Sequence, residues 1–138
     1  MKSKSLSSTE ASASAEQIAS VTPFKSQHLS VRQEQFETIS KCNPTKVPVI
    51  LERAPHSSVP EIDKTKYLVP KELTVAQFLF LIRKRIQLSN DQALFIYLNG
   101  QVPAASAIFS NLYDEHKDED GFLYVVYTGE SCFGNNQN

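Results

Sequence analysis

The stretch Leu73–Leu88, "LTVAQFLFLIRKRIQL", predicts the clearest helix in the chain. Thr74 is a favourable N-cap residue, and Gln77 follows three residues later, at the spacing of a capping box. At about 100° per residue, the recurring apolar positions form one face that is expected to pack on the core. That face comprises Val75, Phe78, Leu79, Ile82 and Ile86. Phe80 falls on the opposite side and is expected to be exposed.

Two strands are predicted before this helix. "KVPVILER" (Lys46–Arg53) is rich in β-branched residues, and "KYLVP" (Lys66–Pro70) forms a second such run. The segment between them, "APHSSVPEID", contains two prolines and two serines and is typical of a loop. Two strands joined by such a loop favour an antiparallel pair, with Pro70 ending the second strand.

After the helix, "ALFIYL" (Ala93–Leu98) predicts a third strand that ends at the turn Asn99–Gly100. "SAIFSNLYDEH" indicates a short helix, and "KDEDG" indicates a polar turn. The nearly continuous apolar run "FLYVVYT" (Phe122–Thr128) is typical of a buried central strand. The order strand, strand, helix, strand, strand predicts an α+β fold, in which a helix crosses one face of a mixed four-stranded sheet, as in ubiquitin.

The N-terminal part has two different compositions. Residues 1–20 are rich in serine and alanine, and we expect a disordered extension because they bury too little apolar surface. Residues 22–41 favour helix, since Leu29, Gln33, Phe36 and Ile39 recur at helical spacing, with Pro44 ending the run. Pro23 interrupts the front of this region, which favours two short helices. The predicted domain spans residues 21–129, and residues 130–138 form a predicted flexible tail.

Composition narrows the function. The chain has 138 residues, and its formal net charge of −1 offers no electrostatic argument for nucleic acid binding. No run is long and apolar enough to span a bilayer, and no signal peptide is visible, so we expect a cytoplasmic protein with reduced thiols. No metal-ligand cluster or nucleotide-binding glycine loop appears. Therefore we expect neither a metal nor another cofactor.

A cysteine hydrolase is the enzymatic alternative. Its thiol and base need a rigid scaffold, and one of the two cysteines lies on the predicted tail. We therefore expect no catalytic activity. The candidate residues for this alternative are Cys42 or Cys132 with His28, His56 or His116.

Four blocks in the same order, and an "FG" pair near the end, resemble the autophagy-related protein eight family. The blocks are "NPTKVPVILER", "DKTKYLVP", "LFLIRKRIQL" and "LYDEHKDEDGFLYVVYTGE". The family includes the microtubule-associated light chain three and GABA-receptor-associated proteins. The resemblance implies a ubiquitin-like β-grasp with two added N-terminal helices. It also implies a modifier without enzymatic activity.

The resemblance further implies processing at the C-terminus. A cysteine protease is expected to recognise Phe133–Gly134, cleave the Gly134–Asn135 bond and remove Asn135–Asn138. Activating and conjugating enzymes are then expected to join the Gly134 carboxylate to phosphatidylethanolamine on autophagosomal membranes. The alternative is an adaptor with the same fold that is never conjugated.

The resemblance also implies a docking surface for cargo receptors and autophagy factors. These partners carry linear motifs with an aromatic and an aliphatic residue separated by two positions. Pocket one is expected to contain Ile39, Pro48, Ile50, Lys66, Leu68 and Phe122. Pocket two is expected to contain Tyr67, Val69, Pro70, Phe78, Leu81 and Arg85. Lys46 and Lys64 are expected to add basic contacts, while Gln35 stands where family members often carry an acidic residue.

Overall fold

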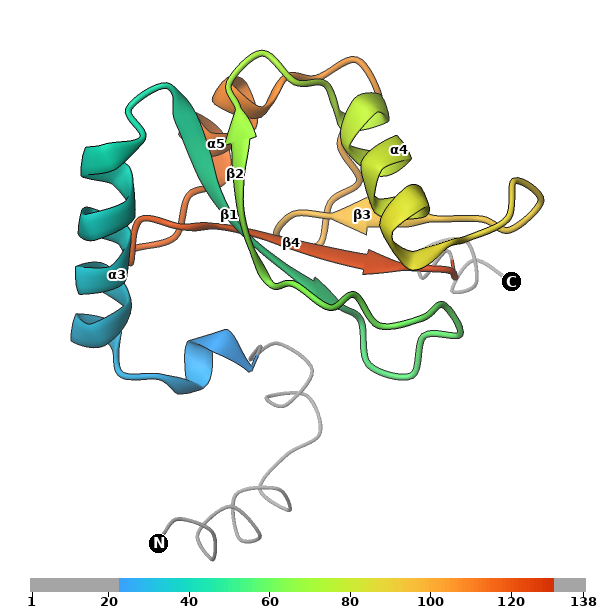
Figure 1. Cartoon of the computed structure of the whole chain (residues 1–138), viewed down its shortest axis with the longest axis horizontal. Coiled ribbons are helices and arrows are strands. Elements are labelled where there is room, and N and C mark those ends of the chain that lie inside the picture. Colours follow the sequence, from blue (N-terminus) through green and yellow to red (C-terminus); the bar gives the residue numbers. More distant parts are fainter. Residues whose placement is uncertain (1–22, 131–138) are drawn as a thin grey trace, which may run out of the picture.

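A mixed four-stranded sheet forms the centre of the molecule (Figure 1). The computed structural model describes residues 23–130. The strand order is β2-β1-β4-β3, and β1 (Lys46–Arg53) pairs in parallel with β4 (Leu123–Thr128). β2 (Lys66–Pro70) and β3 (Phe95–Tyr97) pair antiparallel with β1 and β4, respectively. This arrangement confirms the predicted α+β class and the antiparallel pairing of the first two strands.

The two central strands separate two apolar clusters. Successive side chains of a strand point to opposite faces of a sheet. Val49 and Leu51 of β1 belong to the larger cluster, with α4 (Val75–Ile86) and α5 (Phe109–His116), whereas Ile50 belongs to a smaller one. The smaller cluster joins Ile50 to Phe24 and Phe122. Both faces of the sheet are therefore covered.

Helix α4 follows its sequence pattern closely. Gln77 N–H donates to Thr74 Oγ1 over 3.1 Å, and Thr74 N–H donates to Gln77 Oε1 over 2.9 Å, so the predicted capping box is present. Four of the five predicted core residues are buried, and Leu79 is partly buried. Phe80 is 59% exposed, as predicted.

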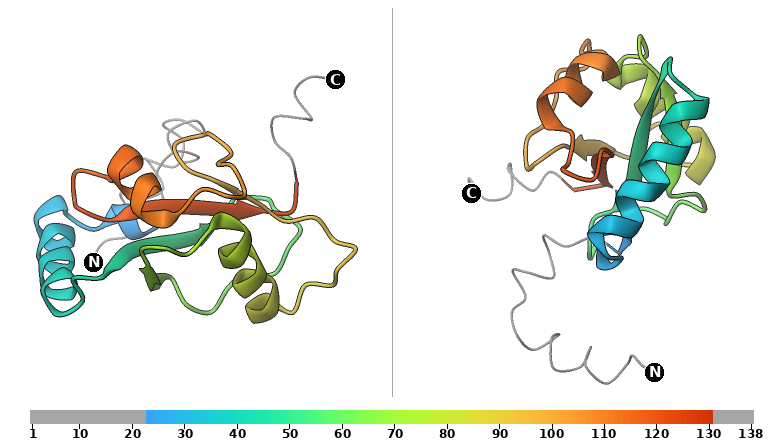
Figure 2. Two further views of the ribbon diagram at one scale, coloured as in Figure 1. Left: turned by 90° about the horizontal axis from the view of Figure 1, so that it is seen from above. Right: turned by 90° about the vertical axis from the view of Figure 1, so that its left-hand side faces the viewer.

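The segment before β1 contains one α-helix, α3 (Leu29–Cys42), and one turn of 3₁₀-helix, η1 (Phe24–Ser26). Two helices were expected here, and within residues 23–130 the first is only this 3₁₀ turn. Figure 2 shows α3 at the opposite end of the molecule from α4. The sequence grouped Gln33 with the apolar positions of this helix, but Gln33 is exposed and Arg32 is buried.

Other boundaries differ by a few residues. β3 is shorter than the predicted strand 93–98, and α5 begins at Phe109 rather than at residue 106. The predicted turn is present, with φ of 51° at Asn99 and 76° at Gly100. The predictions for residues 1–20 and for the tail from residue 131 onward lie outside the described residues.

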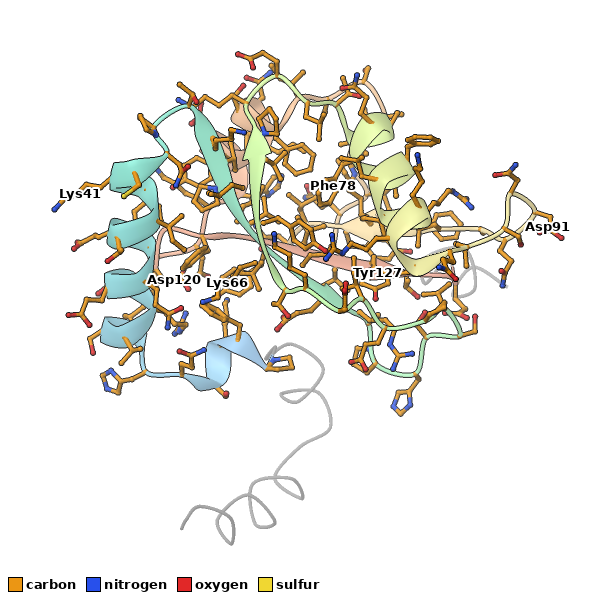
Figure 3. All side chains as sticks on the ribbon, in the orientation of Figure 1. Lys41, Lys66, Phe78, Asp91, Asp120 and Tyr127 are labelled. Carbon is orange, nitrogen blue, oxygen red and sulfur yellow. The ribbon has the colours of Figure 1, made fainter. Side chains whose placement is uncertain are left out.

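A buried ion pair joins α3 to the turn before β4. The sequence predicted this turn, "KDEDG", but not the ion pair. Arg32 Nη1 donates to Asp120 Oδ2 over 2.7 Å, and the carboxylate is 1% exposed. Tyr124 donates to the same oxygen over 2.6 Å, and Phe122 N–H donates to Oδ1 over 2.8 Å. Burial, and then the bond to Asp120, raise the pKa of Tyr124, so the phenol stays a donor. Figure 3 shows Asp120 beside α3.

We expect Arg32→Ala to lower the free energy of unfolding by about 3 kcal/mol, because it leaves the Asp120 carboxylate buried without its cation. Urea denaturation checks this value. Lys41→Ala is the matched control, since Lys41 is exposed on the same helix and makes no ion pair within residues 23–130. Equal effects of the two substitutions would contradict a stabilising role for the buried pair.

Candidate functional site: two cavities at the open edge of strand β2

Strand β2 lies at an edge of the sheet and pairs only with β1 among the described residues. Leu51 N–H donates to Thr65 O over 2.8 Å, just before β2 begins. Hydrogen-bonded and non-hydrogen-bonded pairs alternate along antiparallel strands. The main-chain groups of Lys66 and Leu68 therefore point away from β1. Pro48 lies opposite Leu68 in the register, where no donor is needed.

A cavity of about 450 Å³ lies between β2 and α4, and we call it the α4 cavity. All six residues that the sequence assigned to pocket two line it. It has further lining residues that the sequence analysis missed: Ile62, Leu73, Ile82 and Lys84. Ile82 was assigned to the core, and helical periodicity does not tell a core position from the floor of a cavity.

Aromatic rings form the base of the α4 cavity. Phe78 is 3% exposed, and its ring lies perpendicular to that of Tyr67 with 6.4 Å between centroids. Leu81 is 51% exposed and offers an apolar side wall. The buried Tyr67 hydroxyl has no hydrogen-bond partner within residues 23–130. Burial raises the pKa of Tyr67, so this hydroxyl is protonated at neutral pH.

A second cavity, of about 290 Å³, lies between β2 and α3, and we call it the α3 cavity. Five of the residues assigned to pocket one line it, together with Asn43, Lys64 and Tyr67; the five are Ile39, Pro48, Lys66, Leu68 and Phe122. Ile50, the sixth, is 0% exposed and packs on Phe122 in the smaller apolar cluster. It therefore supports this cavity from below and does not line it.

Lysine side chains surround the α3 cavity. Lys66 Nζ donates to Gln35 Oε1 over 2.9 Å and lies 5.6 Å from the centroid of the Phe24 ring. Lys64 Nζ lies 5.1 Å from the centroid of the Tyr67 ring. Lys46 lines an adjoining hollow that shares Pro48 with the α3 cavity. None of these lysines pairs with a carboxylate in the part of the chain that the structure describes.

Arg85 differs from these lysines because it already has an anionic partner. Its Nε lies 2.8 Å from Asp63 Oδ1. The hydrogen bond from Arg85 lowers the pKa of Asp63. Both side chains are well exposed, so this pair contributes little to stability. Arg85 lines the α4 cavity, and the carboxylate of Asp63 partly neutralises its positive charge.

The two cavities lie on opposite faces of β2. Tyr67 and Val69 point toward the α4 side and pack with the larger apolar cluster, while Lys66 points toward α3. Leu68 lines both cavities. In Figure 3, Phe78 lies on the α4 side of β2 and Lys66 on the α3 side. One open strand edge therefore gives access to two apolar cavities.

The remaining predicted residues add little to this site. Cys42 is exposed, and within residues 23–130 it makes no hydrogen bond to a histidine. Phe133, Gly134 and Cys132 lie outside the described residues. No described helix has the length and apolarity to cross a bilayer.

Comparisons with known proteins agree on one family. The family model described as "Autophagy protein Atg8 ubiquitin like" matches residues 31–134. Autophagy-related protein 8d of Arabidopsis thaliana is 50% identical over 115 residues, which cover 83% of this chain and 96% of the plant protein. Autophagy-related protein 8 of Mycosarcoma maydis is 50% identical over 112 residues, which cover 80% and 95% of the two chains.

A solved structure gives the same result. The crystal structure of Trypanosoma brucei ATG8 aligns with a TM-score of 0.74 at 40% sequence identity. The alignment covers 80% of this chain and 96% of the trypanosome chain. The sheet order, the helix that crosses it and the sequence matches lead to one assignment. This chain belongs to the Atg8 family of autophagy-related ubiquitin-like proteins.

Proposed function

We propose that this protein is a lipid-conjugated modifier of autophagy that docks linear motifs of cargo receptors and autophagy factors along β2. Conjugation joins the Gly134 carboxylate to phosphatidylethanolamine on autophagosomal membranes. The observation that carries the docking proposal is the pair of apolar cavities on opposite faces of one open strand edge.

Strand addition explains how a short peptide gains affinity here. An extended peptide pairs its main chain with the free N–H and C=O groups of Lys66 and Leu68. These groups act on any sequence, so specificity comes from the two cavities.

The two cavities fit a motif with an aromatic and an aliphatic residue separated by two positions. Side chains of an added strand alternate between the faces, so positions one and four point to opposite faces. The aromatic residue enters the α3 cavity, and the aliphatic residue enters the α4 cavity. A motif with one more residue between them would direct both side chains to the same face and leave one cavity empty.

The lysines around the α3 cavity favour acidic residues beside the aromatic one. Lys46, Lys64 and Lys66 form no ion pair with a described carboxylate. A ligand carboxylate that approaches this side of β2 gains attraction without first displacing an internal carboxylate from a lysine. Arg85 gives less attraction, because Asp63 already lies beside it.

Family membership and the position of Gly134 support the proposal of conjugation. A protease thiolate attacks the Gly134 carbonyl and releases the peptide Asn135–Asn138; water then frees the carboxylate. Glycine has no Cβ, so it enters a narrow catalytic channel with little steric conflict. Thioester formation from this carboxylate requires a nucleoside triphosphate, which the activating enzyme would consume. The acyl group then passes between enzyme thiols until the lipid amine attacks its carbonyl carbon and releases the last thiol.

The second candidate function is an adaptor that binds the same motifs and is never conjugated. It needs only the two cavities and the open edge of β2. Cleavage after Gly134 distinguishes the two functions, because an adaptor keeps residues 135–138. An enzymatic role for Cys42 is disfavoured by the missing histidine partner within residues 23–130.

We expect Leu68→Ala to weaken binding of a synthetic acidic peptide with a Trp-Ser-Ser-Leu core by about tenfold, because Leu68 lines both cavities. Isothermal titration calorimetry measures the change. Val102→Ala is the matched control, since Val102 is 54% exposed and lines neither cavity. If both variants bind like the unaltered protein, docking at β2 is wrong. A peptide with one inserted serine should also bind weakly to the unaltered protein.

We expect Gln35→Glu to weaken binding of the same acidic peptide about threefold, because the new carboxylate pairs with Lys66. Binding of a peptide with serines in place of the acidic residues should stay unchanged. The difference should shrink as the salt concentration rises. Gln101→Glu adds the same charge at an exposed residue that lines neither cavity and serves as the control. An equal loss for both peptides would show that charge selection does not reside at Lys66.

We expect Gly134→Ala to slow removal of residues 135–138 by roughly 100-fold, since a methyl group displaces the bond from the catalytic thiol. Intact mass spectrometry after incubation with the cognate cysteine protease measures the mass lost. Asn136→Ala lies in the removed peptide and should be processed at the normal rate. An unaltered protein that keeps its full mass beside a proven active protease would favour the unconjugated adaptor.

A further inference from the structure

The two residues after β4 are tied to the loop between β1 and β2. Gly129 N–H donates to Ser57 Oγ over 3.0 Å, and Thr128 Oγ1 lies 3.2 Å from the same oxygen. Ser57 is 8% exposed although it lies in a loop. A Cβ at Gly129 would lie 2.5 Å from Val59 Cγ1, so only glycine allows this approach without displacement of the loop. The chain therefore leaves the sheet in close contact with residues 57–59.

Glu130 adds a charged contact to this arrangement. Its Oε2 accepts hydrogen bonds from Ser58 N–H, over 3.0 Å, and from the Ser58 hydroxyl. Its Oε1 accepts from the Thr128 hydroxyl over 2.9 Å. A carboxylate that accepts several hydrogen bonds holds its position more firmly than one in water. Glu130 is thus fixed to a loop more than 70 residues away in sequence.

The charge of Glu130 persists over the physiological pH range. The bonds from Ser58, followed by the one from Thr128, lower the pKa of Glu130 to about 2. Because the pKa of Glu130 is lower in the folded state than in the unfolded chain, its ionised carboxylate stabilises the fold. This stabilisation is fully present above the ordinary pKa of 4.5 and is lost as the pH falls toward 2. Glu130 is therefore ionised at neutral pH and remains able to accept these hydrogen bonds.

We propose that Ser57, Ser58 and Glu130 form an anchor that sets the starting point and free length of the chain leading to Gly134 for the enzymes that process and conjugate it. They are positioning residues, and the inference rests on the proposed function. Gly134 comes four positions after Glu130, so their Cα atoms lie at most roughly 14 Å apart. If Thr128 were the last anchored residue, six positions before Gly134, this limit would rise to roughly 21 Å.

A fixed starting point matters to an enzyme that binds the folded domain and carries its thiol at a fixed place. Residues 129 and 130 then need no ordering when the enzyme binds. The anchor should therefore act mainly on binding and less on the chemical step. A contact that served only the stability of the fold would have no such selectivity.

The test measures processing of the full chain by the cognate cysteine protease. The variants are Glu130→Ala, Glu130→Gln, Ser58→Ala and the double variant Ser58→Ala/Glu130→Ala. Glu72→Ala is the matched control, because Glu72 is exposed and makes no hydrogen bond or ion pair through its side chain within residues 23–130. Amide hydrogen exchange at Ser58, whose N–H donates to Glu130 Oε2, and the urea midpoint are measured on each variant.

We expect Glu130→Ala to raise KM about tenfold with kcat within about twofold of normal. Exchange at the Ser58 amide should accelerate, and the urea midpoint should fall modestly, because the Glu130 contact also stabilises the fold. Glu130→Gln keeps one acceptor oxygen and should fall between Glu130→Ala and the unaltered protein. The double variant should be no worse than Glu130→Ala, because the two side chains act through one contact. Glu72→Ala should match the unaltered protein.

Two results would overturn the anchor. The first is normal or faster cleavage of Glu130→Ala despite faster exchange at the Ser58 amide. The second is unchanged exchange at that amide in Glu130→Ala, which would mean that the Glu130 carboxylate does not hold the loop. Both require that the unaltered protein is cleaved after Gly134. If it is not cleaved, the proposed conjugation itself fails, so the two failures are distinguishable.

Discussion

The parallel pairing of β1 with β4 is the contact on which the remaining structure depends. These two strands supply side chains to both faces of the sheet, so one pair of strands builds two apolar clusters. The larger cluster holds α4 and α5, and the smaller one holds Phe24 and, through Phe36 and Ile39, α3. Because β4 occupies one side of β1, β2 pairs on the other side and becomes an edge. The open edge of β2 is thus a consequence of the central pair.

The molecule uses charge in two different ways. Arg32 and Asp120 form a buried pair, with the carboxylate also bonded to Tyr124 and to the main chain. Such a pair fixes the position of α3 against the sheet, since either partner alone would be costly to bury. Lys46, Lys64 and Lys66 lie nearby but are exposed, and neutral Gln35 contacts Lys66. The buried pair orders the fold, whereas the exposed lysines remain available to a ligand.

The proposed docking groove and the proposed anchor lie at different places on the same sheet. The groove uses the outer edge of β2, while the anchor joins the end of β4 to the loop before β2. A motif-bearing partner and a processing enzyme therefore have separate contacts available to them. Both features depend on the loop 54–65, because it sets where β2 begins and also holds Glu130.

Local patterns were enough to predict α4, with its capping box, and the bounds of β1 and β2, because these features depend on residues close in the sequence. The residues of pocket two followed from the family resemblance, and the structure brings all six together.

Other features could be recognised only in the folded chain. Arg32 and Asp120 are 88 positions apart in the sequence, and Ser58 and Glu130 are 72 positions apart. No periodic pattern in the sequence links the two members of either pair. Likewise, the family resemblance assigned Ile50 to pocket one, but only packing against Phe122 decided that it lies beneath the α3 cavity. Helices and strands arise from contacts within a segment, whereas cavities and ion pairs arise between segments that meet only when the sheet forms.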